Sequence, residues 1–266
     1  MKAKQKIKET ALVTGASFGI GLEMARLLAR EGHDLVLVAR SVEKLNEVAR
    51  ELEKEGVKVH ILVRDPSLPG SAKSLYEEVV KREYPVSWLI NNAGHGLHGR
   101  FDEMDPERIT GMLRLNIEAL TELTRFFIPG MRKAGYGRIL NVASTAAFQP
   151  GPLMAAYYAS KAYVLMFSEA IAEELRGTGI KVSTLCPGPT HSEFQERAGM
   201  AHVALFKRFS MDTQKVAKAG IHGMKKGKRL IIPGLLNKFL AFSTRFSPRC
   251  LLSKIVYSLQ AGRTEK

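Results

Sequence analysis

Tyr157 and Lys161 lie four positions apart in a stretch of helical pattern, and Ser144 precedes them at the end of an apolar, strand-like run. Residues four apart share one face of a helix, so the ammonium of Lys161 would lie beside the phenol of Tyr157. A fixed cation favours the phenolate and lowers the pKa of a tyrosine from its ordinary value of about 10. Such a tyrosine can donate a proton to a carbonyl oxygen or accept one from an alcohol. The alternative interpretation of this spacing is a half-buried ring beside a solvated amine.

A glycine-rich turn near the start of the chain could bind a dinucleotide. An apolar run, 11–14, leads into it, and apolar residues at helical spacing follow it. In a strand, turn and helix of this kind, backbone N–H groups at the helix N-terminus receive a pyrophosphate. A purely structural turn is the alternative. The candidate cofactor contacts in the turn are Gly15, Ser17, Phe18, Gly19 and Ile20.

The end of the second expected strand, 35–39, indicates which dinucleotide would bind. A carboxylate at this point would hydrogen-bond the ribose 2′-hydroxyl of NAD, but the chain has Arg40 there. An arginine accommodates a 2′-phosphate, so the expected cofactor is NADP(H). The alternative is that Arg40 is only a surface charge.

Four motifs in order resemble the classical short-chain dehydrogenases/reductases. Thr14 precedes Gly15 and Gly19 with the glycine spacing of that family, and the run 91–94 reads Asn-Asn-Ala-Gly. Ser144 stands 13 positions before Tyr157, and the register Tyr-x-Ala-Ser-Lys ends at Lys161. This register leaves Tyr158 as a packing or substrate-side ring. The last motif is the Pro-Gly turn at 187–188.

The resemblance implies a role for each matching residue. Ser144, Tyr157, Lys161 and Asn116 would be catalytic, with Asn116 supporting a proton relay to the lysine. A core asparagine bonded to backbone is the alternative for Asn116. Tyr157 and Lys161 would also touch the cofactor, and Asp65 would contact its adenine, although an Asp at that point is also a common turn former. The remaining cofactor contacts implied are Asn92, Ala93, Gly94, Pro187, Gly188 and Thr190.

The alternation of strand-like and helix-like segments, together with the resemblance, predicts one α/β domain. We expect a single Rossmann-type, doubly wound parallel sheet with helices on both faces. Residues 1–234 would form the NADP-binding catalytic domain, with a substrate lid at 190–210. The lid segment is largely apolar, which favours an apolar substrate, although its side chains could equally belong to the core.

The segment 235–266 reads as a basic amphipathic C-terminal extension. Residues 201–266 hold 14 Lys plus Arg against Asp212 and Glu265, a net +12, which leaves +2 of the total +14 for the first 200 residues. Basic amphipathic helices can lie on an anionic membrane, so 235–260 is a candidate for peripheral membrane contact. A lid and an oligomer face are the alternatives.

Composition excludes several classes of protein and of partner. No apolar stretch has the length of a signal peptide or a membrane span, so we expect a cytoplasmic chain, with peripheral contact at the inner face of a membrane through the extension. The only cysteines, Cys186 and Cys250, provide neither a disulfide framework nor metal-ligand spacing. No nucleic-acid-binding motif occurs, and we expect no nucleic-acid partner and no metal. The family resemblance implies a homodimer or homotetramer.

Three segments, 35–55, 128–160 and the basic tail, look closest to the branch of long-chain 3-oxoacyl-CoA reductases and 17β-hydroxysteroid dehydrogenases. The resemblance therefore implies an NADP(H)-dependent oxidoreductase of lipid metabolism. It would interconvert a hydrophobic ketone, such as a 3-oxoacyl thioester, and its secondary alcohol. The alternative is a non-catalytic NADP-binding scaffold or regulator that associates with membranes.

Overall fold

A computed structural model describes residues 9–190, 193 and 210–261. Within these residues, seven parallel strands form one sheet in the order β3-β2-β1-β4-β5-β6-β7. The predicted doubly wound parallel sheet is confirmed. The strands are β1 (Thr10–Thr14), β2 (Asp34–Ala39), β3 (Val59–Val63), β4 (Val86–Asn91), β5 (Gly137–Val142), β6 (Ile180–Leu185) and β7 (Leu230–Ile231).

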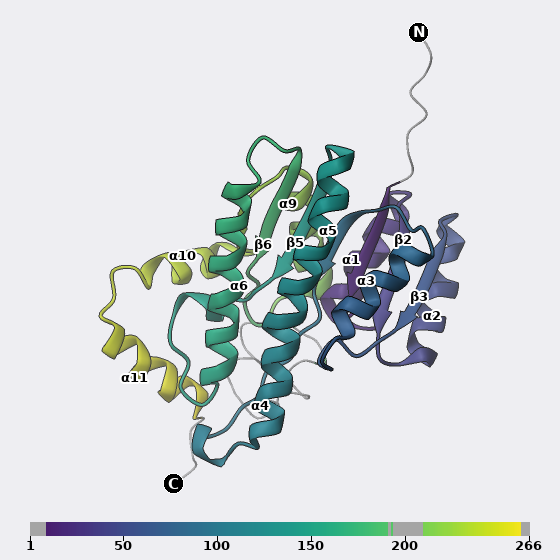
Figure 1. Ribbon diagram of the computed structural model, residues 1–266. Helices are drawn as coiled ribbons and strands as arrows, with labels where there is room; N and C mark the ends of the chain where they lie inside the picture. The colour runs from purple at the N-terminus through teal and green to yellow at the C-terminus, as the bar shows by residue number, and fades with distance from the viewer. Residues whose placement is uncertain (1–8, 191–192, 194–209, 262–266) are drawn as a thin grey trace.

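Helices cover both faces of the sheet. The first layer consists of α1 (Gly19–Arg30), α2 (Val42–Leu52) and α9 (Thr213–Lys225). The second consists of α3 (Ser71–Lys81), α5 (Leu120–Ala134) and α6 (Ala155–Glu174), with α5 and α6 in front of the strands in Figure 1. Side chains alternate along each strand, so Ala11 and Val13 pack against the first layer and Leu12 against the second.

The order of the strands determines where a ligand can bind. From β1 the chain proceeds through β2 and β3 to one edge of the sheet, and from β4 it proceeds to the other edge. At such a switch point the loops after the neighbouring strands separate and leave a crevice at the carboxyl ends of the strands. Here the loops after β1 and β4 carry the glycine turn and the segment 91–94.

The long helical segment before β5 changes its winding in the middle. α4 (Pro106–Leu113) continues through a π-helical segment, η3 (Arg114–Ala119), into α5. Asp105 caps its start by accepting a hydrogen bond from Glu107 N at 2.9 Å. Single π-helical turns within α-helices are frequent at functional sites, and this one contains Asn116.

Two helices follow the sheet, α10 (Leu235–Ser243) and α11 (Arg249–Gln260). They extend beyond α6 at the edge of the molecule, and α11 returns toward the N-terminal end of α6 (Figure 1). Within the described residues, no helix has both the length and the apolarity needed to cross a bilayer. Nearly all of the predicted lid at 190–210 lies outside the described residues. Thr190, the first residue of that segment, pairs in a parallel bridge with Met211, which follows the last one.

Candidate active site

The glycine turn fits tightly against the loop that follows β4. Gly15 has a φ of +66°, and its N–H donates to Val38 O at 2.8 Å. A Cβ at Gly15 would lie 2.9 Å from the Asn92 amide nitrogen and 3.0 Å from the Ala93 Cα. A residue with a side chain is therefore excluded here both by the backbone conformation and by the lack of space. Ser17, Phe18, Gly19 and Ile20 complete the turn and open α1.

Thr14 holds the two loops together. Its hydroxyl accepts hydrogen bonds from the N–H groups of Asn92 and Ala93, each at 3.0 Å, and donates to Ile90 O at 3.3 Å. The Asn92 side-chain amide donates to the carbonyls of Thr14 (3.0 Å) and Gly15 (3.2 Å). Thr14 was predicted only as part of the glycine motif and not as a site residue. Its position one residue before the first glycine was the available signal.

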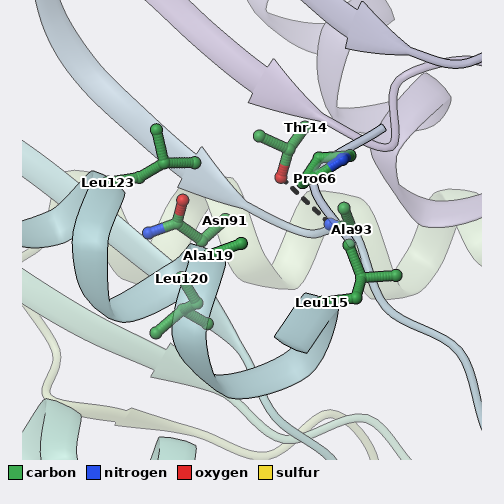
Figure 2. A pocket seen from close by; sticks show the side chains of 8 residues that line it. All are labelled: Thr14, Pro66, Asn91, Ala93, Leu115, Ala119, Leu120 and Leu123. Carbon is green, nitrogen blue, oxygen red and sulfur yellow. Dashed lines mark hydrogen bonds between the residues drawn. The ribbon is translucent and has the colours of Figure 1, made fainter. Parts of the chain in front are cut away.

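A small pocket lies beneath these loops, with the bond from Ala93 to Thr14 at its rim (Figure 2). It is lined by Thr14, Pro66, Asn91, Ala93, Leu115, Ala119, Leu120 and Leu123. Its volume of about 10 Å³ corresponds to about one water molecule. The Oδ1 of Asn91 is buried and has no hydrogen-bond partner among the described residues. The pocket thus suits a structural water and is too small for a substrate.

Arg40 and Asp65, expected to contact the 2′-phosphate and the adenine of the cofactor, are neighbours. Arg40 Nη1 lies 3.6 Å from Asp65 Oδ2, and Asp65 Oδ1 accepts hydrogen bonds from the Ser67 N–H (2.9 Å) and hydroxyl (2.6 Å). Burial alone would raise the pKa of Asp65, but the bonds from Ser67 and the charge of Arg40 hold the pKa below its ordinary value. Asp65 is therefore fixed as an ionised acceptor, whereas the Arg40 side chain is largely exposed.

Ser144, Tyr157 and Lys161 come together after the carboxyl end of β5. The Tyr157 hydroxyl hydrogen-bonds the Ser144 side chain. The Ser144 hydroxyl also accepts from Ala146 N at 3.1 Å and lies 3.5 Å from Pro187 O. Lys161 Nζ donates to Val142 O at 2.9 Å and lies 5.8 Å from the centre of the Tyr157 ring.

The prediction that Lys161 lowers the pKa of Tyr157 was wrong. Burial raises the pKa of Tyr157, and the hydrogen bond from Ser144 only partly opposes this rise. Burial also lowers the pKa of Lys161 to about 8. The physical reason is that both groups are fully buried, which favours their neutral forms, and that the amine is directed to the Val142 carbonyl instead of the phenol oxygen. The phenol consequently stays protonated at neutral pH.

Asn116 is fixed by three hydrogen bonds. Its Oδ1 accepts from His95 N at 3.2 Å, and its Nδ2 donates to His95 O and Ser160 Oγ, each at 3.0 Å. The bonds to His95 are those of an asparagine bonded to backbone, the alternative left open by the sequence. A Cβ at Gly94 would lie 3.0 Å from Asn116 Oδ1 and 3.2 Å from Lys161 Nζ, so Asn116 and Lys161 face the same small space. Ser160 was not predicted as part of this network.

The turn after β6 brings the remaining predicted residues to the same edge of the sheet. Pro187 O accepts from Thr145 N at 2.9 Å, which ties the turn to the residue after Ser144. Gly188 packs against Asn237, whose Oδ1 would lie 2.5 Å from a Cβ at that position. Thr190 Oγ1 donates to Gly188 O at 2.9 Å. The predicted contacts 187–190 thus adjoin the catalytic candidates.

Basic residues surround His95, which follows Gly94. Burial lowers the pKa of its imidazole first, the charges of Arg40, Lys161 and Arg108 lower it further, and the charge of Asp65 opposes them. Three cations and one carboxylate therefore act on this point of the site, and the excess of positive charge suits a ligand that carries phosphate groups. Among the residues that the structure describes, no group of three or more His, Cys, Asp and Glu side chains could hold a metal ion.

Comparisons with known proteins agree with this geometry. Residues 9–202 match the family model described as short chain dehydrogenase. The ketoacyl reductase HetN of Nostoc sp. is 32% identical over 232 residues, which cover 86% of this chain and 76% of the relative. A very-long-chain 3-oxoacyl-CoA reductase of Anas platyrhynchos is 36% identical over 66% of this chain and 58% of the relative. Among solved structures, a short-chain dehydrogenase from Sphingobium yanoikuyae in complex with NADPH superposes with a TM-score of 0.81 at 33% identity, covering 90% of this chain and 93% of that chain.

Proposed function

The chain belongs to the short-chain dehydrogenase family, as its motifs predicted, and on that premise we propose that it is an NADP(H)-dependent reductase of hydrophobic ketones. The reverse reaction on the secondary alcohol uses the same groups. The observation that carries the proposal is the cluster of Ser144, Tyr157 and Lys161 at the end of β5, beside the glycine turn.

The residues around the crevice fit an NADP(H) molecule. Gly15 and Gly94 have no room for a Cβ, so only glycine lets these two loops pack as closely as they do around the proposed cofactor site. The N-terminus of α1 would receive the pyrophosphate, Arg40 the 2′-phosphate and Asp65 the adenine. The rest of the site would be lined by Asn92, Ala93, Pro187, Gly188 and Thr190. The solved relative from Sphingobium yanoikuyae holds NADPH, which supports this cofactor. When bound, the reduced nicotinamide supplies the hydride for the carbonyl carbon.

Tyr157 is the proton donor in this proposal. Its raised pKa keeps the phenol protonated until a carbonyl oxygen gains negative charge in front of it. Ser144 shares a hydrogen bond with that phenol, so its hydroxyl can bind the same developing oxyanion. Because the pKa of Lys161 is about 8, its amine can be charged or neutral close to that pH. It would contact the cofactor ribose. Asn116, fixed beside Lys161, supports proton supply to the amine.

The proposed substrate is a hydrophobic ketone such as a 3-oxoacyl thioester, which places the enzyme in lipid metabolism. Tyr157 belongs to an apolar cluster whose side chains would contact the acyl chain of such a substrate. It consists of Leu97, Met112, Ala146, Met154 and Tyr157, with Met104, Ile109, Ala156 and Tyr158 packed against it. Relatives named as ketoacyl and very-long-chain 3-oxoacyl-CoA reductases support this class.

The alternative, a non-catalytic NADP-binding scaffold, is not favoured. Such a protein has no need to bury a lysine close to a buried tyrosine and a serine, because burying the lysine disfavours its charge and therefore costs stability. The intact set therefore supports an enzyme.

Two further proposals concern partners and location. We propose a homodimer or homotetramer and a peripheral contact of residues 235–260 with an anionic membrane, at its cytoplasmic face. α10, α11 and the segment between them expose large apolar side chains: Leu235, Leu236, Phe239, Leu240, Phe242, Phe246, Leu251 and Ile255. The segment 235–260 contains Lys238, Arg245, Arg249 and Lys254 and no acidic residue. A two-fold contact between copies would bring these like charges together, whereas anionic lipid attracts each of them.

The proposed function is tested by following NADPH oxidation at 340 nm with 3-oxoacyl thioesters, steroids, retinoids and small ketones. We expect turnover with at least one 3-oxoacyl thioester, and KM values that fall as the acyl chain lengthens. NADPH binding without turnover on any member of the panel would favour the scaffold instead.

A further inference from the structure

α11 contacts the body of the protein through one narrow face. Most of its residues are exposed, and only Val256 (4% exposed) and Gln260 (1% exposed) are buried. These two residues are four positions apart, so they share a face of the helix. Val256 is an ordinary apolar anchor, but a glutamine buried this completely has to be explained by its partners.

Gln260 connects two segments that border the active site. Its Nε2 donates to the Tyr158 hydroxyl at 2.9 Å, and its backbone carbonyl accepts from His98 Nε2 at 3.2 Å. The two segments are also joined to each other, because Gly99 N donates to Leu153 O at 2.9 Å. Gln260 thus links α11 to the loop after β4 and to the start of α6, which also contact each other.

Tyr158 stands directly beside the proposed proton donor. Its ring centre lies 6.0 Å from that of Tyr157, with the two rings nearly perpendicular. The Tyr158 ring also packs on Gly151, where a Cβ would lie 2.1 Å from a ring carbon. With Gly151 beneath it and Gln260 at its hydroxyl, the ring is held in one orientation. It forms part of the apolar wall that would receive the substrate.

We propose that Gln260 is a specificity-determining, positioning residue of the reductase, and that α11 completes the substrate side of the active site. The inference rests on the proposed function. Gln260 fixes the ring of Tyr158, and this ring limits the space beside Tyr157 for the larger group of the ketone. The chemistry at the carbonyl does not require Gln260, so it affects how well a bulky substrate binds and leaves the catalytic step nearly unchanged.

The unsatisfied half of the Gln260 amide supports a role beyond anchoring the helix. Its Oε1 is buried, and none of the described residues donates a hydrogen bond to it. Leaving a buried acceptor unpaired is unfavourable, and an apolar residue such as Val256 would attach the helix without that penalty. A glutamine here is useful because its Nε2 reaches the one hydroxyl that orients the Tyr158 ring.

The test compares a bulky and a small ketone on four proteins: wild type, Gln260→Met, Tyr158→Phe and the double variant. Methionine keeps the length of the glutamine side chain but cannot bond the phenol. We expect Gln260→Met to raise KM for a long-chain or aryl ketone about tenfold, with kcat and the KM of a small ketone changed less than about twofold. Tyr158→Phe should act in the same way, and the double variant should be no worse than either single one.

Ser258→Ala is the matched control, because Ser258 is exposed on the same turn of α11 and its hydroxyl donates to Lys254 O within its own helix. NADPH affinity and thermal unfolding midpoints are measured on every variant. The midpoint shifts of the two single changes should also fail to add, which tests the bond without turnover.

Additive effects of the two changes, or equal KM changes for both ketones, would overturn the inference while leaving the reductase intact. A wild type inactive on every ketone would instead contradict the proposed function, and the specificity role with it.

Discussion

Arg40 Nη1 lies 3.6 Å from Asp65 Oδ2, so the two residues proposed to hold the adenosine end of the cofactor form an ion pair with each other. Asp65 is further held by Ser67, whereas the exposed Arg40 side chain has freedom to move. A 2′-phosphate would offer the guanidinium a stronger, charge-assisted partner. The ion pair thus keeps Arg40 near its proposed position. Because an exposed pair at this distance adds little to stability, breaking it to bind a phosphate would cost little free energy.

Arg40→Ser should shift the enzyme away from NADPH. Loss of charge-assisted bonds to a phosphate should raise KM for NADPH by about 10- to 100-fold, with KM for NADH nearly unchanged. Steady-state kinetics with both cofactors measure this. Arg50→Ser, at an exposed arginine on α2, is the control and should change neither value. Equal losses for both cofactors would show that Arg40 does not bind the 2′-phosphate.

Tyr157→Phe should remove turnover without removing cofactor binding. The hydroxyl is the only group of this residue that can donate a proton, and its loss should lower kcat by about 10³-fold. Tyr158→Phe should keep most of kcat, because Tyr158 is not in register with Lys161. NADPH binding followed by fluorescence should be similar in both variants. The opposite order of activities would assign the proton transfer to Tyr158.

Lys161→Met should inactivate the enzyme but stabilise the fold at neutral pH. Burial lowers the Lys161 pKa from 10.5 to about 8, so at pH 7 the folded state carries a charge that it disfavours. Each pKa unit corresponds to about 1.4 kcal/mol, and the lost bond to Val142 O offsets part of the gain, which leaves about 2 kcal/mol.

The sign of the pH dependence follows from proton binding. Between pH 8 and 10.5 the unfolded chain keeps the lysine proton that the folded protein has lost, so wild-type stability rises with pH in this window. The advantage of Lys161→Met should therefore disappear toward pH 10.5. Denaturant unfolding at pH 7 and 10 measures it, with Lys218→Met, at an exposed lysine, as the control. A gain of equal size at both pH values would contradict the argument.

Gly94→Ala should impair catalysis more than folding. The added Cβ would press on Asn116 Oδ1 at 3.0 Å and on Lys161 Nζ at 3.2 Å, both of which would have to shift by a few tenths of an ångström. We expect kcat to fall by about 10- to 100-fold, because small misplacements at an active site are costly, and stability to fall by about 1 kcal/mol. Gly111→Ala is the control, since nothing lies within 4 Å of its Cβ, and it should stabilise α4 slightly.

Membrane contact should depend on both the apolar and the basic side chains of α10 and α11. Flotation with anionic vesicles should recover the wild type, and Lys238→Glu with Lys254→Glu should abolish recovery, at about 1 kcal/mol per charge. Phe239→Ser should weaken it, whereas Met166→Ser, at an exposed apolar residue of α6, should not. Recovery that is unaffected by the charge reversals would contradict a lipid role. Loss of a dimer on Phe239→Ser would show that this face contacts a second copy.

The sequence was sufficient for the fold and for the prediction that the candidate site residues gather at one edge of the sheet. Local periodicity marks the strands and helices, and parallel strands bring the residues at their carboxyl ends to one edge, so Gly15, Gly94 and Ser144 could be placed together without a structure. The spacing from Tyr157 to Lys161 also gave the shared helix face. All of these depend on short-range rules or on one topological rule.

Side-chain orientation and burial could not be obtained in the same way. The amine of Lys161 had two polar atoms within reach, and only packing shows that it bonds Val142 O and leaves the pKa of Tyr157 raised. The contact of Gln260 with Tyr158 joins residues 102 positions apart and carries no local pattern. Thr14 was visible in the sequence, but its bonds to Asn92 and Ala93 required the two loops to be in place.

The bond from Gln260 to Tyr158 also has a consequence for biosynthesis. All seven strands and the proposed cofactor contacts, up to Thr190, precede α10 and α11 in the chain. Tyr158 receives its amide partner only after about a hundred more residues have been translated. The wall of the proposed substrate site is therefore completed last during synthesis, and a protease that cut between α10 and α11 would separate Gln260 from the sheet that carries the proposed cofactor site.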